Sequence, residues 1–452
     1  MRADRRRFLR AAGALTARGL VPALGAWSTR ANAQAAPYRA LVCVFLEGGN
    51  DGNNTVVPLD DYANYAAGRP NGGTGAALAS AELLPIAPAN LTRRFGLHPN
   101  LAPLVPLFEQ KKLALVANVG TLVAPLTRAE YAAGQKRPRN LFSHSDQQLT
   151  AQGQIPGAMA PSGWGGRAID ALGGGNDGRG IPGMVSLAGD ALFTVGVTSL
   201  PVALSRFGSL GLGVDRESPE GQVRYEALAR ILAADRDNQL VAQAQEVMAL
   251  AVRSSEALAG ALNDANGVID NAFAGVNSGL ADQLYQTAKL IAARGALGVS
   301  RQGFFTSMGG YDTHNEQRGE QARRFDELAP ALAAFQRALD ALGVADQVTT
   351  FTLSDFNRTF RINANAGTDH AWGGPQVVLG GAVRGGMMHG QFPDLAMGGP
   401  DDASDYGAWI PTTSFDQYGA TLARWFGVPP ARLPEIFPNL SAFPVQDVGF
   451  LA

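Results

Sequence analysis

Short apolar runs alternate along this chain with stretches of helical periodicity, and this alternation constrains the fold more than any other feature. The runs that read as strands are residues 39–46, 113–119, 184–188, 192–197, 303–307, 347–353 and 377–379. The helical stretches are residues 99–110, 145–152, 317–342 and 414–426, with two or three more helices within residues 215–298. Strands that alternate with helices predict an α/β fold, in which helices flank both faces of a mostly parallel sheet.

Acidic residues follow three of the expected strands. Asp51 comes after the first strand, among glycines and asparagines, while Asp312 and Asp355 come after two later strands. In sheets of this kind, ligands bind at the carboxyl ends of the strands. We therefore expect three strands to deliver their carboxylates to one edge of the sheet.

The N-terminus has the order of an export signal. Residues 4–10, DRRRFLR, resemble a twin-arginine motif, and residues 31–33, ANA, resemble a cleavage site. The apolar stretch between them is interrupted by Arg18 and is too weak for a stable membrane span, which needs about 20 apolar residues. We expect a signal peptide of residues 1–33, export by the twin-arginine translocation machinery, and a periplasmic or secreted protein. The alternative is an amphipathic helix that stays on the protein.

The rest of the chain is expected to be a single domain, residues 34–452, with a helical insertion at residues 215–298. Residues 1–33 carry seven Arg and one Asp, a charge of +6, so the whole-chain charge of −2 leaves −8 for the remainder. A mildly acidic protein has no electrostatic reason to bind nucleic acid or anionic lipid. The single cysteine, Cys43, cannot form an internal disulfide and is expected to be a small buried core residue.

Two short motifs combine aspartate with histidine, at residues 312–314 and 368–370. Asp312 and His314 are two positions apart, which places both side chains on one side of an extended segment. Carboxylates and imidazoles gathered at strand ends suit one or two divalent metal ions, with zinc or manganese favoured and calcium or magnesium as alternatives. The candidate ligands are Asp51, Asp312, His314, Asp355 and His370. The alternative for each of them is an ordinary hydrogen-bonded loop or turn residue.

Three further residues are candidates for acting on a substrate. Ser143 precedes an expected helix, whose unpaired amide groups would stabilise an alkoxide or an anion, unless the residue only caps the helix. His144 is a base, a ligand or neither. Arg358 would hold an anionic substrate with its planar guanidinium, or would pair with a structural acid.

Several common site types are missing from the sequence. It has no nucleotide-type phosphate loop, no Gly-x-Ser-x-Gly elbow, no His-Glu-x-x-His helix and no paired Cys-x-x-Cys motif. These absences argue against P-loop enzymes, α/β-hydrolases, zincins and structural zinc modules.

Motifs over nearly the whole of residues 34–452 resemble the family called "domain of unknown function 1501". They are FLEGGNDGNN at 45–54, LHP at 97–99, SH at 143–144, GYDTH at 310–314, SDFNRT at 354–359 and GTDH at 367–370. That family is similar to the alkaline phosphatase and sulfatase superfamily. The resemblance therefore implies an alkaline-phosphatase-like fold, with two divalent metals about 4 Å apart around a phosphate or sulfate ester.

The resemblance also implies roles for individual residues. Asp51 resembles the aspartate ligand after the first strand. Asp312 and His314 resemble the ligand pair of one metal, which His370 completes. Asp355 resembles the aspartate of the other metal.

Ser143 falls where the superfamily places its nucleophile, but the chain departs from the pattern elsewhere. Phe356 stands where the phosphatases have a histidine, so the second metal lacks a ligand unless His144 or Asp369 replaces it. The sulfatase activation pattern Cys/Ser-x-Pro-x-Arg is absent, which argues against a formylglycine sulfatase.

The sequence therefore predicts an exported, metal-dependent hydrolase that acts on a phosphate or sulfate ester of a small molecule or a polymer. Ser143 or an activated water molecule would attack, the metal would stabilise the developing charge, and Arg358 would orient the anion. The alternative is a non-catalytic, metal-binding cell-envelope protein of the same fold. A third interpretation is a metal-free structural protein.

Overall fold

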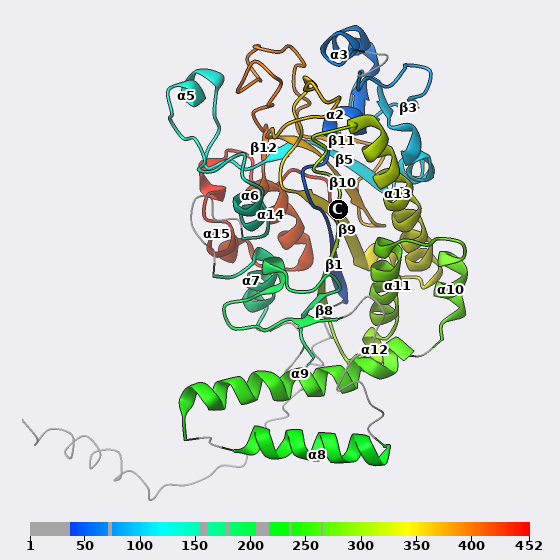
Figure 1. Cartoon of the computed structure of the whole chain (residues 1–452), viewed down its shortest axis with the longest axis vertical. Coiled ribbons are helices and arrows are strands. Elements are labelled where there is room, and N and C mark those ends of the chain that lie inside the picture. Colours follow the sequence, from blue (N-terminus) through cyan, green and yellow to red (C-terminus); the bar gives the residue numbers. More distant parts are fainter. Residues whose placement is uncertain are drawn as a thin grey trace, which may run out of the picture. The chain divides into compact units, whose positions relative to one another are not determined.

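Nine strands of the described residues form one sheet, which Figure 1 shows. Its order is β11 (Met388–His389), β5 (Leu113–Gly120), β10 (Gly374–Leu379), β9 (Val348–Ser354), β1 (Arg39–Leu46), β8 (Arg301–Met308), β6 (Met184–Ser186) and β7 (Val202–Ala203), with β12 (Thr413–Ser414) also paired to β5. This computed structural model describes residues 37–70, 75–153, 161–174, 176, 181–204, 217–234, 237–263 and 265–452. The expected signal peptide, residues 1–33, lies outside the described residues.

The sheet is mostly parallel, as predicted. β10 runs antiparallel to both β5 and β9, whereas the pairings of β1 with β8 and β9, and of β6 with β7 and β8, are parallel. Because β10 is antiparallel to both of its neighbours, β5 and β9 point the same way as β1 and β8. The carboxyl ends of these four strands therefore meet at one edge of the sheet.

Helices cover both faces of the sheet, because successive residues of a strand point to opposite sides. Val44 of β1 packs in one core with Phe335 of α13 (Gln317–Ala341). Its neighbour Cys43, which is buried and free as expected, packs in the opposite core with Trp164 of α7 (Trp164–Ala171). In Figure 1, α13 and α11 (Gly279–Ala292) lie on one side of the sheet, and α6 (His144–Gly153) and α14 (Phe415–Phe426) lie on the other.

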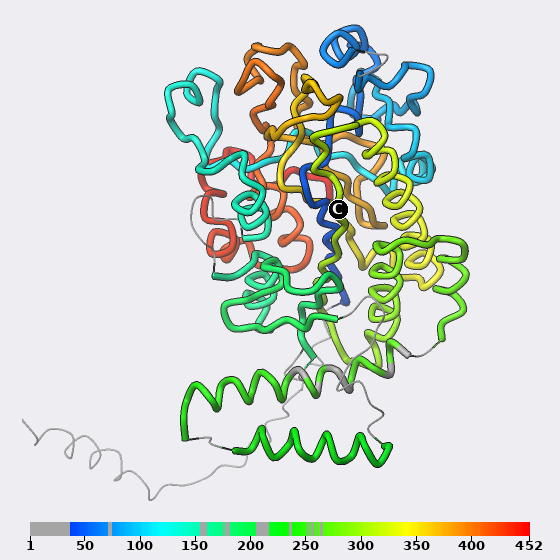
Figure 2. The backbone as a smooth tube through the Cα atoms, viewed as in Figure 1, coloured from blue at the N-terminus to red at the C-terminus, as the bar shows by residue number. Residues whose placement is uncertain are grey.

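The helical region expected at 215–298 contains more helices than the two or three predicted. Its described helices are α8 (Pro219–Ala233), α9 (Gln239–Asn263), α10 (Gly267–Phe273), α11 and α12 (Arg294–Leu297), which Figure 2 traces in green. Side-chain caps divide the region. Asn266 accepts hydrogen bonds from the first amides of α10, and Ser278 does the same for α11. Each cap satisfies amides that a continuous helix would not leave free.

The described residues also form several shorter helical elements. They are α2 (Gly52–Thr55), η1 (Leu59–Asp61), α3 (Tyr62–Gly68), η2 (Pro99–Leu104), α4 (Val105–Glu109), α5 (Arg128–Ala132), η3 (Leu192–Thr194), η4 (Ala345–Gln347), η5 (Pro430–Arg432), α15 (Leu433–Ile436) and η6 (Leu440–Ala442). A second, antiparallel sheet has the order β2 (Val56–Pro58), β4 (Phe95–Leu97) and β3 (Leu84–Ile86). None of the described helices is long and apolar enough to cross a bilayer.

Two sequence predictions were wrong in detail. Residues 192–197 do not form a strand, because η3 occupies 192–194 and the Asp170 carboxylate accepts the amides of Val197, Thr198 and Ser199. These amides are therefore not available to a sheet. The single helix expected at 99–110 is divided into η2 and α4, where Pro103 and Pro106 lack the amide hydrogen that a continuous helix needs.

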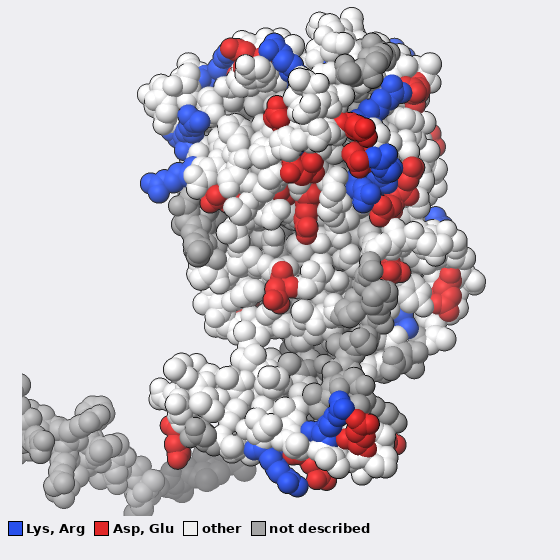
Figure 3. All heavy atoms as spheres, in the orientation of Figure 1, with Lys and Arg blue, Asp and Glu red and all other residues white. Residues whose placement is uncertain are grey.

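On the face of the molecule in Figure 3, acidic and basic side chains are interspersed. The lysines and arginines of the described residues do not gather into one continuous patch on that face.

Candidate metal centre

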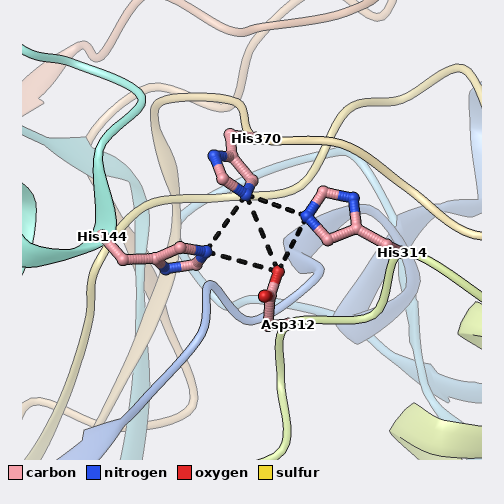
Figure 4. A group of neighbouring side chains, drawn as sticks. All are labelled: His144, Asp312, His314 and His370. Carbon is pink, nitrogen blue, oxygen red and sulfur yellow. Dashed lines mark hydrogen bonds and ion pairs between the residues drawn. The ribbon is translucent and has the colours of Figure 1, made fainter.

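Four side chains from two loops and the start of α6 converge at the carboxyl edge of the main sheet (Figure 4). His144, Asp312, His314 and His370 each offer one ligand atom, and these atoms all lie within 4.8 Å of one another. His370 Nε2 lies 3.0 Å from both His144 Nε2 and His314 Nε2. Asp312 Oδ1 lies 3.3 Å from His144 Nε2, 3.0 Å from His314 Nε2 and 3.7 Å from His370 Nε2.

These separations match a four-coordinate metal site. Ligands at the roughly 2.0–2.1 Å typical of zinc occupy the corners of a tetrahedron whose edges measure about 3.3–3.4 Å. The five edges measured here run from 3.0 to 3.7 Å. The sixth separation, between His144 Nε2 and His314 Nε2, is at most 4.8 Å. The four atoms therefore lie close enough together to surround one cation of the size of zinc.

Glycines allow the loops of the site to approach one another closely. Gly48, just after β1, has φ +110°, and a Cβ there would lie 2.3 Å from the amide nitrogen of Asp312. A Cβ at Gly367 would lie 2.0 Å from the carbonyl oxygen of His314. A larger residue at either position would separate the loops that carry the ligands.

Each histidine turns its Nδ1 away from the cluster, toward a hydrogen-bond acceptor. The acceptors are Asp355 Oδ2 for His144 at 2.7 Å, Asp369 Oδ1 for His314 at 3.1 Å, and the Phe142 carbonyl oxygen for His370 at 2.7 Å. Carbonyls and ionised carboxylates only accept, so each Nδ1 carries the proton and each Nε2 turns a lone pair toward the others. Three lone pairs and a carboxylate oxygen repel one another unless a cation lies between them.

The electrostatics of the cluster also suit a divalent cation. Burial is the largest influence on the pKa of Asp312 and raises it, but the charge and hydrogen bond of Arg358, together with the neighbouring His144 and His314, outweigh burial. The net pKa therefore lies below its ordinary value, and the carboxylate stays ionised. Burial lowers the pKa of His370, which keeps this ring neutral and its Nε2 free to bind. With neutral histidines, the formal charges of three carboxylates (Asp312, Asp355 and Asp369) and one guanidinium (Arg358) sum to −2. One divalent cation balances that charge.

Of the five ligands expected from the sequence, Asp312, His314 and His370 lie in the cluster, whereas Asp51 and Asp355 do not contribute a ligand atom to it. Asp355 instead orients His144, and it also accepts hydrogen bonds from Gln148 Nε2 at 3.0 Å and the Gly48 amide at 3.2 Å.

Asp51 lies in a different environment from the cluster. Its carboxylate caps α2 by accepting the Asn53 amide at 3.0 Å and forms an ion pair with Arg69. Both side chains of the pair are 0% exposed. The guanidinium of Arg69 therefore supplies the positive charge that this buried carboxylate needs.

His144 is the fourth member of the cluster; the sequence left its role open between a base, a ligand and neither. It is the first residue of α6, where no periodic pattern marks a ligand. The sequence signal was only its place beside Ser143, before a helix. Asp369 was noted as a replacement ligand, but it hydrogen-bonds His314 Nδ1 instead.

Ser143 and Arg358 both lie beside members of the cluster. The Ser143 hydroxyl donates to Asp146 Oδ2 at 2.5 Å, and its carbonyl accepts the Gln147 amide, as in a helix cap. Arg358 is fully buried, and its Nη1 donates to Asp312 Oδ1 at 2.9 Å. This contact corresponds to the alternative in which Arg358 pairs with an acid of the protein.

The Phe356 ring packs against two of the ligands. Its centroid lies 4.7 Å from the ring of His144 and 4.8 Å from the ring of His370. Phe356 therefore supports the orientation of these two rings by direct packing and offers no ligand atom of its own.

Comparison with known proteins gives a family. Residues 38–405 match the profile of a family described as "Protein of unknown function (DUF1501)". The comparison with curated proteins found no match.

Two solved structures are similar at a low level. The PsFucS1 sulfatase from Pseudoalteromonas sp. is 10% identical, with 92% of this chain and 72% of that chain covered and a TM-score of 0.34. Ps i-CgsB in complex with k-i-k-neocarrahexaose is 9% identical, with 89% and 77% covered and a TM-score of 0.33. Likenesses this low carry no argument about the reaction.

Proposed function

We propose that this chain, which belongs to the DUF1501 family, binds one divalent cation between His144, Asp312, His314 and His370 and hydrolyses a phosphate or sulfate ester. The observation that carries the proposal is the convergence of three imidazole Nε2 atoms on one carboxylate oxygen, with every Nδ1 fixed from outside. A divalent cation held in this way supplies a Lewis acid that polarises an ester oxygen.

The exposure of the ligands supports a catalytic role. Their side chains are 24–49% exposed, so a dissolved ester can reach the cluster. Structural zinc sites are normally closed. The proposed substrate is therefore an anionic ester, either a small molecule or part of a polymer.

The residues around the ligands hold the site in place. Asp355 and Asp369 fix the rings of His144 and His314, and the buried Arg358 fixes Asp312. The proposed attacking group is water or the Ser143 hydroxyl, which Asp146 orients. Since Arg358 is 0% exposed, the cation rather than this arginine is proposed to hold the anion.

One cation accounts for the geometry better than two. Asp51 is neutralised by Arg69, and Phe356 stands where a histidine would serve a second metal. An alkaline-phosphatase-like fold for a single domain of residues 34–452, and export by the twin-arginine pathway, remain part of the proposal. The parallel sheet, with its site at the carboxyl edge, supports the fold, and residues 4–10 support the export.

A second candidate is a non-catalytic metal-binding protein of the cell envelope. The observation that favours it is that the chain offers four ligand atoms to one cation, whereas catalytic zinc sites usually have three protein ligands and keep one position for water.

Hydrolysis of nitrophenyl phosphate and nitrophenyl sulfate by zinc- or manganese-loaded protein tests the proposal. We expect the Asp312→Ala variant to lose at least about 99% of the wild-type rate, because it removes a ligand. The control is Asp340→Ala, which removes a partly exposed aspartate of α13 that pairs with Lys112; it should keep full activity. Wild-type protein that binds the metal but hydrolyses neither ester would favour the second candidate.

A further inference from the structure

The threonines of the two histidine motifs meet at one acceptor. Thr313 precedes His314, and Thr368 lies two residues before His370. Their side chains are buried, 4% and 0% exposed. Both hydroxyls donate to Gln317 Oε1. The distance from Thr368 Oγ1 to Gln317 Oε1 is 2.9 Å, and the two hydroxyl oxygens lie 3.4 Å apart. Together, Thr313, Gln317 and Thr368 form what we call the threonine clasp.

The acceptor itself is held in place. Gln317 is the first residue of α13 and is 0% exposed. Its Nε2 donates to Gln321 Oε1 at 3.1 Å, and Gln321 Nε2 donates to the Asp51 carbonyl oxygen at 2.7 Å. Because both ends of the Gln317 amide are bonded, its oxygen is directed toward the two threonines.

The clasp also reaches a third ligand. Thr368 Oγ1 accepts a hydrogen bond from Arg358 Nε at 3.1 Å, and Arg358 Nη1 donates to Asp312 Oδ1 at 2.9 Å. Separately from the side chains, the Thr368 amide donates to the Thr313 carbonyl oxygen at 2.9 Å. The hydroxyl of Thr368 therefore joins the two histidine loops and orients the guanidinium that holds Asp312.

We propose that the threonine clasp positions His314, His370 and Asp312 for the cation, and so sets the affinity and the coordination geometry of the site. The inference rests on the proposed metal site. Replacing the Thr368 hydroxyl by a methyl group leaves Arg358 Nε without its acceptor and Gln317 Oε1 with one donor fewer. The backbone hydrogen bond between the loops remains, so the fold is expected to survive.

The test measures metal binding rather than activity. Zinc affinity is obtained by competition with a chromophoric chelator, and coordination geometry from the visible absorption of the cobalt-loaded protein. Loss of partners outside the ligand shell typically weakens metal binding about 10–100-fold. We expect about tenfold weaker zinc binding for Thr368→Val, with a changed cobalt spectrum, and recovery in Thr368→Ser, which keeps the hydroxyl.

The chain offers a matched control in Thr349. This threonine of β9 is 0% exposed, and its hydroxyl has no hydrogen-bond partner among the described residues. Thr349→Val should therefore bind zinc and cobalt like the wild type. Thr313→Val and Gln317→Met, measured in parallel, remove the other two members of the clasp and stand in for Thr368→Val if that variant does not fold.

The possible results distinguish a failure of the threonine clasp from a failure of the metal site on which it rests. Wild-type protein that binds neither zinc nor cobalt would overturn the proposed metal site and the clasp with it. A wild type that binds while the folded clasp variants match it in affinity and spectrum would overturn the clasp alone. Equal weakening by Thr349→Val would also overturn it, because a general loss of core stability would then explain the effect.

Discussion

The orientation of His144 by Asp355 gives a prediction whose size follows from the structure. Asp355 is 1% exposed. It accepts hydrogen bonds from His144 Nδ1 at 2.7 Å, Gln148 Nε2 at 3.0 Å and the Gly48 amide at 3.2 Å. In Asp355→Asn, one of the two oxygens becomes an NH₂ group. In one orientation the new NH₂ group faces His144 Nδ1 and Gln148 Nε2, and in the other it faces the Gly48 amide. All of these groups are donors, so a donor faces a donor in either case.

The substitution should weaken zinc binding without unfolding the chain. The loss of a carboxylate behind a ligating histidine costs about 10–100-fold in metal affinity, which is about 1.4–2.7 kcal/mol. We expect the upper part of that range, because the formal charge of the site also changes from −2 to −1 when one of its three carboxylates is neutralised.

The assay is chelator competition at fixed ionic strength, and the control is Asp416→Asn. Asp416 is equally buried, but it lies in the first turn of α14, outside the cluster. A double-mutant cycle with His144→Ala adds a second check, since Asp355 is argued to act through His144. The reasoning fails if Asp355→Asn binds zinc as the wild type does, or if it weakens binding by the same factor when His144 is absent.

Three further substitutions test separate parts of the structure. Gly48→Ala would place a Cβ 2.3 Å from the Asp312 amide at φ +110°; zinc titration should show that binding is lost, and unaltered affinity would contradict the close packing. Arg69→Met would leave Asp51 buried without its partner and should cost about 3–5 kcal/mol in urea unfolding, while zinc affinity of the folded protein stays the same; a loss below about 1 kcal/mol would argue against the ion pair. Burial raises the pKa of Asp416 to about 7, although hydrogen bonds from Asn439 and the charge of Arg167 oppose it. The protonated form is thus favoured in the folded state, so its contribution to stability is complete below the unfolded pKa and disappears as the pH rises through about 7. The free energy of unfolding of Asp416→Asn should therefore match that of the wild type near pH 4 and exceed it near pH 8, by an amount on the order of 4 kcal/mol. If urea unfolding gives the same difference between the two proteins at both pH values, the raised pKa is contradicted.

The strands of the main sheet were the part of the fold that the sequence predicted best. β1 spans Arg39–Leu46, the range expected for it. A parallel strand covered on both faces must be apolar at almost every position, and that pattern is visible without any tertiary information. The second sheet was missed because β2, β3 and β4 have three residues each, too few to produce a recognisable alternation.

The sequence likewise predicted only part of the candidate site. Asp312, His314 and His370 stand in short motifs near strand ends, and their convergence follows from the parallel topology. His144 was identified as a site residue, but its position among the ligands depends on how α6 packs over β9, which no local pattern encodes. The partner of Asp51 was equally hidden, because Arg69 is brought to it by the packing of α3.

Anomalous diffraction from crystals of the zinc-loaded protein, recorded on both sides of the zinc absorption edge, would locate the proposed cation. We expect one strong peak at about 2.0–2.2 Å from Nε2 of the three histidines and Oδ1 of Asp312, the four atoms that face one another. Zinc bound elsewhere on the chain, or no peak between these atoms, would contradict it.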